Sequence, residues 1–249
     1  MVSEALKGVF RSLRTYHGPH APKARMDALS VRFMAPDDIV FDIGAHVGDR
    51  VSSFRRLGAR VIAVEPQPLL QQALRHIHGR DPGVILVPAA VGSENRQATL
   101  HVNSRNPTVS TLSDAFMVEA FSADGWENQI WDKVISVPVV TLDRLISTFG
   151  PPVFIKIDVE GVEDDVLLGL SQSVPALSFE FTTIAREVAL RCFDRLSVLG
   201  PYRFDVVLGE NQTPTFYRWI TAPEMAHHIR NLPHAANSGD VYAVLAENG

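Results

Sequence analysis

Short runs of consecutive apolar residues alternate along this chain with segments in which apolar residues recur every three or four positions. The first pattern is typical of strands buried in a parallel sheet, and the second of helices that cover it. We expect strands near 39–43, 60–64, 84–87, 153–157, 176–181, 203–208 and 240–246. Intervening helices are expected near 47–57, 67–78, 161–170, 184–199 and 222–230. This order predicts an α/β fold with a doubly wound, mostly parallel seven-stranded sheet.

The N-terminal segment 1–35 lies outside this alternation and is predicted to form a helical cap. Apolar residues recur at helical spacing in its first part, namely at Val2, Leu6, Val9, Phe10 and Leu13. Such a face can cover the sheet or a partner subunit equally well. The sequence therefore leaves open whether the chain forms a homodimer.

A second addition, the segment 93–138, is predicted to be an insert that contains strands near 98–102 and 134–140. Its middle, 103–132, is polar but carries aromatic residues such as Trp126 and Trp131. An insert of this length in a compact domain often has a functional role. We favour a lid on the substrate side, with a purely structural flap as the alternative.

Composition fits one folded domain over 1–249. Of the residues, 46% are hydrophobic, and the net charge of -5 with no basic run argues against a nucleic-acid substrate. Cys192 is the single cysteine, which excludes an internal disulfide and fits a reducing cytoplasm. No apolar run approaches the roughly 18 residues of a membrane span, and charged residues interrupt the first fourteen positions. We therefore expect a cytoplasmic protein without a signal peptide or membrane segment.

The decapeptide 40–49, Val-Phe-Asp-Ile-Gly-Ala-His-Val-Gly-Asp, leads from a strand through two glycines into a helix. Gly44 permits a sharp turn, and Gly48 removes a side chain where a ligand or the strand would press on the helix. By itself this is equally an ordinary strand-to-helix turn. Glu65, which ends the next strand about 20 positions later, has the spacing of a ribose-binding carboxylate. Because the glycines do not follow the dinucleotide pattern, a single-nucleoside cofactor fits better than NAD or FAD.

The segment 154–163, Phe-Ile-Lys-Ile-Asp-Val-Glu-Gly-Val-Glu, is a predicted buried strand that ends in carboxylates. Lys156 lies in the middle of this apolar strand, where an unpaired ammonium would be too costly. Its partner is expected to be Asp158, Glu160 or Glu180. The group either forms an ion pair that only fixes the strand ends, or positions an acceptor hydroxyl and takes its proton.

Together these segments resemble the FkbM family of S-adenosylmethionine-dependent methyltransferases. The resemblance covers 38–182 and rests on the segments 42–48, 64–66, 89–92, 137–143 and 154–163. One departure is His46, where the family usually has Asn. The resemblance implies a Rossmann-like methyltransferase fold, with 38–182 as the cofactor-binding core and 183–249 as the C-terminal part of the sheet.

The same resemblance implies S-adenosylmethionine as the cofactor. The glycine turn would border its methionine moiety, Glu65 its ribose and the segment 89–91 its adenine. We expect the cofactor to contact Asp42, Gly44, Ala45, His46, Gly48, Glu65, Pro66, Ala90 and Asp158. Ser110 and Thr111 are further candidates from the insert.

The expected reaction is O-methylation of a hydroxyl on a small molecule or saccharide. The candidate catalytic residues are Asp158, Glu160, Lys156 and Glu180, with Asp158 as the first choice for the general base. N-methylation, aminopropyl transfer and a non-catalytic nucleoside-cofactor-binding module remain alternatives. Asp158, Glu160 and Asp164 offer oxygens to a divalent ion, but the histidines lack ligand spacing, so we expect no metal.

Overall fold

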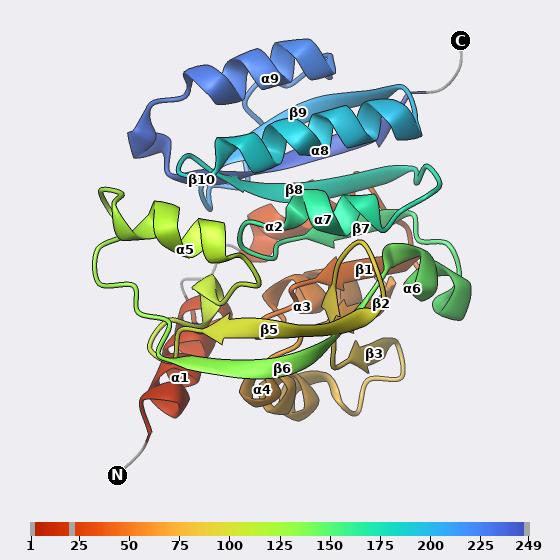
Figure 1. The fold of residues 1–249 in the computed structure, drawn as a ribbon. Helices are drawn as coiled ribbons and strands as arrows, with labels where there is room; N and C mark the ends of the chain where they lie inside the picture. Colours follow the sequence, from red (N-terminus) through yellow and green to blue (C-terminus); the bar gives the residue numbers. More distant parts are fainter. Residues whose placement is uncertain (1–2, 20–22, 247–249) are drawn as a thin grey trace.

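The computed structural model of the protein describes residues 3–19 and 23–246. Its main sheet contains seven strands, in the order β3 (Val84–Val87), β2 (Arg60–Val64), β1 (Ile39–Ile43), β7 (Phe154–Ile157), β8 (Ala176–Thr182), β10 (Ser238–Leu245) and β9 (Tyr202–Leu208) (Figure 1). Neighbouring strands are parallel except for β10, which is antiparallel to both β8 and β9. The predicted doubly wound, mostly parallel fold is confirmed, and each predicted strand lies within two residues of its position.

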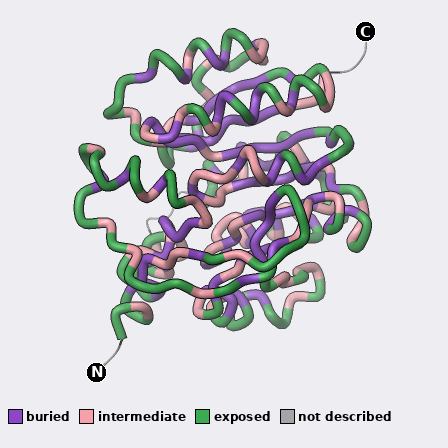
Figure 2. The backbone as a smooth tube through the Cα atoms, viewed as in Figure 1, coloured by how far each residue is buried: buried purple, intermediate pink, exposed green. Residues whose placement is uncertain are grey.

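Helices cover both faces of this sheet because its strands bury alternate side chains in opposite directions. On one face, α2 (Lys23–Ser30), α3 (Asp49–Arg56) and α4 (Pro68–His78) cover residues such as Val40 and Phe154. On the other, α6 (Leu142–Phe149), α7 (Glu163–Leu168), α8 (Arg186–Leu199) and α9 (Ala222–Asn231) cover residues such as Phe41 and Phe179. Figure 2 shows the buried sheet between helices whose outer faces are exposed. This arrangement leaves the strand ends free to carry polar side chains.

Helix α6 was not predicted from the sequence, although its start carries a recognisable signal. The Thr141 side chain accepts a hydrogen bond from the Arg144 backbone N–H, which is the usual N-cap arrangement. Leu142, Leu145 and Ile146 then face the core at helical spacing. The signal was missed because the apolar strand β6 ends directly before Thr141, so the two apolar patterns run together.

The insert and the preceding strand form a second, three-stranded sheet in the order β4 (Ala90–Val91), β6 (Lys133–Val140) and β5 (Arg96–Val102). Strands β5 and β6, which correspond to the two strands predicted in the insert, are antiparallel. Between them lie η1 (Pro107–Val109) and α5 (Asp114–Phe121). Phe116 and Trp126 pack together with Ala185 near the start of α8. The polar middle of the insert is therefore folded, with a small aromatic core of its own.

The N-terminal helix α1 (Glu4–His17) packs against α4 and η1. Val9 contributes to a cluster with Val47 and Leu70, whereas Val2, also part of the predicted apolar face, lies outside the described residues. Part of the predicted face thus covers the chain's own glycine turn. Among the described residues, no helix combines the length and the apolar character that crossing a bilayer requires.

Candidate functional site

A cavity of about 390 Å³ opens at the carboxyl ends of β1, β2, β7 and β8. Strands β1 and β7 are neighbours in the sheet but not in the sequence, so this is the switch point at which doubly wound folds bind ligands. The insert and Tyr16 of α1 complete the wall. Among the described residues, acidic side chains outnumber basic ones in the cavity wall. The acidic residues are Asp42, Asp49, Glu65, Asp158, Glu160, Glu180 and Glu210, and the Lys and Arg residues are Lys156 and Arg50.

Gly44 sits where β1 leaves the sheet and passes against the end of β7. Its φ is +82°, and a Cβ built there would lie 1.8 Å from the carbonyl oxygen of Asp158. Both the backbone conformation and the close approach therefore require glycine. This contact fixes the spacing between the glycine turn and the acidic residues after β7.

We expect Gly44→Ala to lower the melting temperature by about 5 to 15 °C, from roughly 2–5 kcal/mol of backbone and steric strain. Gly125→Ala is a matched control because Gly125 has φ +84° but nothing within 4 Å of its built Cβ. Gly125→Ala therefore includes the cost of the positive φ but not that of a steric clash. Thermal unfolding of both variants checks the prediction, and equal shifts would contradict the proposed importance of the contact with Asp158.

His46 and Gly48 form the second half of the glycine turn. The His46 ring packs edge-on against Tyr16 with ring centroids 5.3 Å apart, and its buried Nε2 has no hydrogen-bond partner in the described chain. Burial lowers the pKa of His46 to about 4, so the imidazole is neutral at neutral pH. Gly48 caps α3 and lies under Leu74 and His78, outside the described cavity wall.

Glu65 directly follows β2 and lines the cavity. One carboxylate oxygen accepts the backbone N–H of His46 at 3.0 Å, and the other accepts that of Gln67 at 2.8 Å. Burial nevertheless raises the pKa of Glu65 to about 8. A carboxylate has about four lone-pair sites, so the arrangement leaves two acceptor positions for a ligand.

Two hydrogen-bonded contacts hold the insert over the cavity. The Gln67 side chain donates to the carbonyl of Pro107 at 3.0 Å and accepts from the Ser110 hydroxyl at 3.2 Å. At the opposite wall, Trp126 Nε1 donates to the side-chain oxygen of Asn237 at 3.1 Å. The sequence analysis named Ser110 but missed Gln67 and Asn237. Neither belongs to a recognisable motif, and their roles follow from where the insert folds back.

Lys156 forms a buried ion pair with Asp158, two residues further along the chain. Asp42 lies beside Lys156 in the β1–β7 register, and neither of its carboxyl oxygens has a hydrogen-bond partner among the described residues. Burial raises the pKa of Asp42 to about 7, with Lys156 opposing that rise. The sequence left three carboxylates as possible partners of Lys156, and the structure shows that Asp158 is the one with which it pairs.

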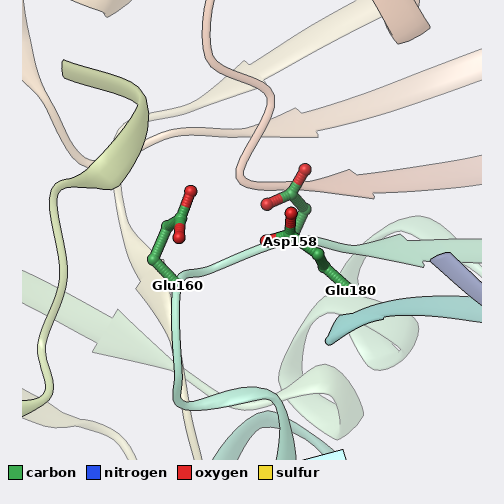
Figure 3. A group of neighbouring side chains, drawn as sticks. All are labelled: Asp158, Glu160 and Glu180. Carbon is green, nitrogen blue, oxygen red and sulfur yellow. The ribbon is translucent and has the colours of Figure 1, made fainter. Parts of the chain in front are cut away.

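Asp158 and Glu160 follow β7, and Glu180 lies on the neighbouring strand β8 (Figure 3). One oxygen from each lies within 4.8 Å of an oxygen from each of the others. Burial and then the charge of Asp158 raise the pKa of Glu180 well above its usual range. Although burial opposes it, the Lys156 ammonium lowers the pKa of Asp158, and a hydrogen bond with Glu180 adds to this effect. Asp158 therefore holds a negative charge more readily than Glu180.

The backbone between β7 and α7 is held in place by two polar contacts. Glu160 has a positive φ of 59°, and its carbonyl accepts the Thr111 hydroxyl at 2.6 Å. Glu163 accepts the backbone N–H groups of Val159 and Gly161 at 3.1 Å each. Thr111, a cofactor candidate from the sequence, thus contacts this loop and is not part of the described cavity wall.

The cavity has the chemistry of a site for a cationic nucleoside. Glu65 offers two free acceptor positions, and Asp42 offers two buried oxygens without partners. Its two permanent cations are already bound, since Lys156 pairs with Asp158 and Arg50 donates to Asp240 and Gln212. A ligand that brings a ribose and a positive charge would satisfy these groups.

Comparison with known sequences agrees with this description. The profile of the family described as "Methyltransferase FkbM domain" matches residues 42–234. The hexuronic acid methyltransferase AglP of Haloferax volcanii is 23% identical over 150 residues, which make up 59% of this chain and 56% of that protein. The chain therefore spans little more than half the length of this curated relative.

Two solved structures are among those matched to the chain. An O-methyltransferase from Bacillus cereus in complex with SAH is 11% identical, with a TM-score of 0.47 over 99% of this chain and 92% of that one. Fibrillarin of Aeropyrum pernix with bound S-adenosyl-L-methionine is 9% identical, with a TM-score of 0.46 over 89% of this chain and 73% of that one.

Proposed function

The chain belongs to the FkbM family of S-adenosylmethionine-dependent methyltransferases, and from this premise we propose that it methylates a hydroxyl group of a saccharide or similar small molecule. The observation that carries the proposal is that one cavity is lined by Glu65 after β2, by Asp158 and Glu160 after β7, and by Glu180 on β8. One end of the cavity suits a nucleoside cofactor. The other end suits an acceptor that must lose a proton.

For the cofactor we propose contacts that follow the geometry of the turn. Glu65 would accept both ribose hydroxyls, and Ala89, Ala90 and Val91 would lie along the adenine. Asp42 and Asp158 would face the positive charges of the methionine moiety, near Gly44 and His46. The bound cofactor supplies an electrophilic methyl group on a sulfonium centre.

Asp158 is the proposed general base. It is ionised at neutral pH, and its position beside Glu180 allows an acceptor hydroxyl to bind between the two carboxyl groups. In the transfer, the hydroxyl oxygen would bond to the methyl carbon while the carbon–sulfur bond breaks and leaves the neutral thioether, S-adenosylhomocysteine, and the hydroxyl proton would pass to Asp158. Lys156 keeps Asp158 oriented, and most of the rate enhancement would come from holding the oxygen in line for displacement.

The acidity of the cavity favours an oxygen acceptor over an amine. An amine in contact with several carboxylates binds as the ammonium ion, which has no lone pair with which to attack a methyl group. A hydroxyl remains neutral and donates its proton to a carboxylate. The relative named as a hexuronic acid methyltransferase supports a saccharide as the acceptor.

Ligand-dependent thermal unfolding tests the cofactor assignment. At about a hundred times its dissociation constant, a ligand stabilises the native state by roughly 2.7 kcal/mol, about 5 to 10 °C for a domain of this size. We expect such a shift with S-adenosylmethionine and S-adenosylhomocysteine, and none with NAD or ATP. A shift with NAD or ATP alone would contradict the assignment, and preference for decarboxylated S-adenosylmethionine would indicate aminopropyl transfer.

The acceptor proposal needs a separate assay. Matched pairs of neutral sugars and amino sugars are incubated with methyl-labelled S-adenosylmethionine, and products are identified by mass spectrometry. Labelled O-methyl products support the proposal. Labelled N-methyl products from the amino sugars alone would overturn it in favour of N-methylation.

A further inference from the structure

We propose that Asp158, Glu160, Glu180 and Thr182 bind a hard divalent cation such as Mg²⁺ or Mn²⁺. The three carboxylates come from two adjacent strand ends and meet in one place (Figure 3). Their ligand atoms lie within 4.8 Å of one another. Oxygen ligands surround Mg²⁺ or Ca²⁺ at about 2.0 to 2.6 Å, so atoms on opposite sides of one ion are about 4 to 5 Å apart. A single ion can therefore reach all three groups.

Unpartnered oxygens give a second, independent indication of a ligand. Glu160 is 6% exposed and Thr182 is 5% exposed, yet Glu160 Oε2 and Thr182 Oγ1 have no hydrogen-bond partner among the described residues. The same holds for Glu180 Oε2. Thr182 and Glu180 point to the same face of β8 because side chains alternate along a strand, and both line the cavity. Buried oxygens without partners are costly unless a bound group satisfies them.

The charge balance points to a cation. Asp42, Asp158, Glu160 and Glu180 are gathered around one ammonium group, that of Lys156, which is already bonded to Asp158. The Arg50 guanidinium donates hydrogen bonds to Asp240 and Gln212. No histidine or cysteine is among the described members of the cluster. An all-oxygen set of this kind favours Mg²⁺, Mn²⁺ or Ca²⁺ over zinc.

The sequence analysis expected no metal because the histidines lack ligand spacing, and the oxygen set that it considered was Asp158, Glu160 and Asp164. Asp164 instead pairs with Arg191 at 2.5 Å. The additional oxygens come from β8, about twenty residues along the chain. Binding of the ion does not depend on the proposed function. Its role does rest on that function: it would bind the acceptor oxygen and favour loss of its proton.

Titration of the chelator-treated full chain with Mn²⁺, followed by electron paramagnetic resonance of free Mn²⁺, tests the site. We expect one ion per chain with a dissociation constant of about 10⁻⁶ to 10⁻³ M, displaced by Mg²⁺. Glu160→Gln should weaken binding at least about tenfold. Glu210→Gln is the matched control because it removes the same charge from an exposed residue of the cavity wall, and it should change binding less than about threefold.

Absence of Mn²⁺ binding to the wild-type chain, or equal losses in the two variants, would overturn the proposal. S-adenosylhomocysteine binding is measured on the same samples in EDTA. If it is retained while Mn²⁺ fails to bind, the cation site is wrong and the proposed function stands. If Mn²⁺ binds but S-adenosylhomocysteine does not, the proposed function fails instead.

Discussion

Replacing Asp158 by Asn is expected to lower kcat by about 10²- to 10⁴-fold, the range for loss of a general base, and to weaken S-adenosylhomocysteine binding less, by under about tenfold, through the lost charge near the methionine moiety. Asn has nearly the same shape but cannot take a proton at neutral pH. Lys156 retains Asp42 as a neighbouring carboxylate, which limits the structural cost. Turnover with the acceptor identified by the labelling assay, together with calorimetric binding of S-adenosylhomocysteine, checks both parts.

Asp240→Asn is the control for this variant. It weakens another buried ion pair, that with Arg50, but Asp240 is not part of the described cavity wall. We expect it to lower stability while kcat changes less than about tenfold. If Asp158→Asn retained full turnover, Asp158 would not be the base.

The proposed cation adds a further discrimination, because Asp158 is a member of both sites. Turnover of Asp158→Asn is therefore measured with and without excess Mn²⁺. Rescue by the ion would mean that Asp158 acts only as a ligand of the metal and is not the base. Without rescue, acceptors with more acidic hydroxyls should lose less activity than ordinary alcohols, because they depend less on a base.

The order of the main-sheet strands was predictable because each strand is a short apolar run and each connection contains a helical period. The glycine turn and Glu65 were also accessible, since their spacing is set by one βαβ unit. The pairing of Lys156 was narrowed to three carboxylates by the cost of an unpaired buried ammonium. All of these inferences depend on patterns among residues that lie close together in the sequence.

What the sequence could not provide are contacts that the fold makes between distant segments. Gln67 bonds to Ser110 of the insert, and Trp126 of the insert bonds to Asn237 before β10. Thr182 lines the same cavity as the acidic residues after β7 only because β8 pairs with β7. The predicted lid remains a prediction. Its folded aromatic core and its contacts with the cavity wall are consistent with both a lid and a structural flap.

Glu65→Ala is expected to weaken S-adenosylhomocysteine binding about 100-fold or more. Two hydrogen bonds from ribose hydroxyls to the ionised form of Glu65 contribute roughly 3–6 kcal/mol, since bonds to charged groups are worth about 1.5–3 kcal/mol each. Ionising a carboxyl group whose pKa is about 8 offsets about 1.4 kcal/mol of this at neutral pH. The same carboxylate also accepts the backbone N–H groups of His46 and Gln67. A loss of affinity alone would therefore not separate a missing ribose contact from a relaxed turn.

An analogue of S-adenosylhomocysteine that lacks both ribose hydroxyls separates these effects. If Glu65 binds the ribose, the wild-type chain loses about the same affinity for the analogue as Glu65→Ala loses for the full ligand, and the variant binds both ligands almost equally. This non-additivity isolates the direct contact. Losses that simply add would mean that Glu65 acts by holding the backbone of the turn, and unchanged binding in the variant would remove Glu65 from the cofactor site. Because the nucleoside assignment depends on Glu65 at the end of β2, that last result would leave only the acidic residues after β7 and on β8 as evidence for a ligand.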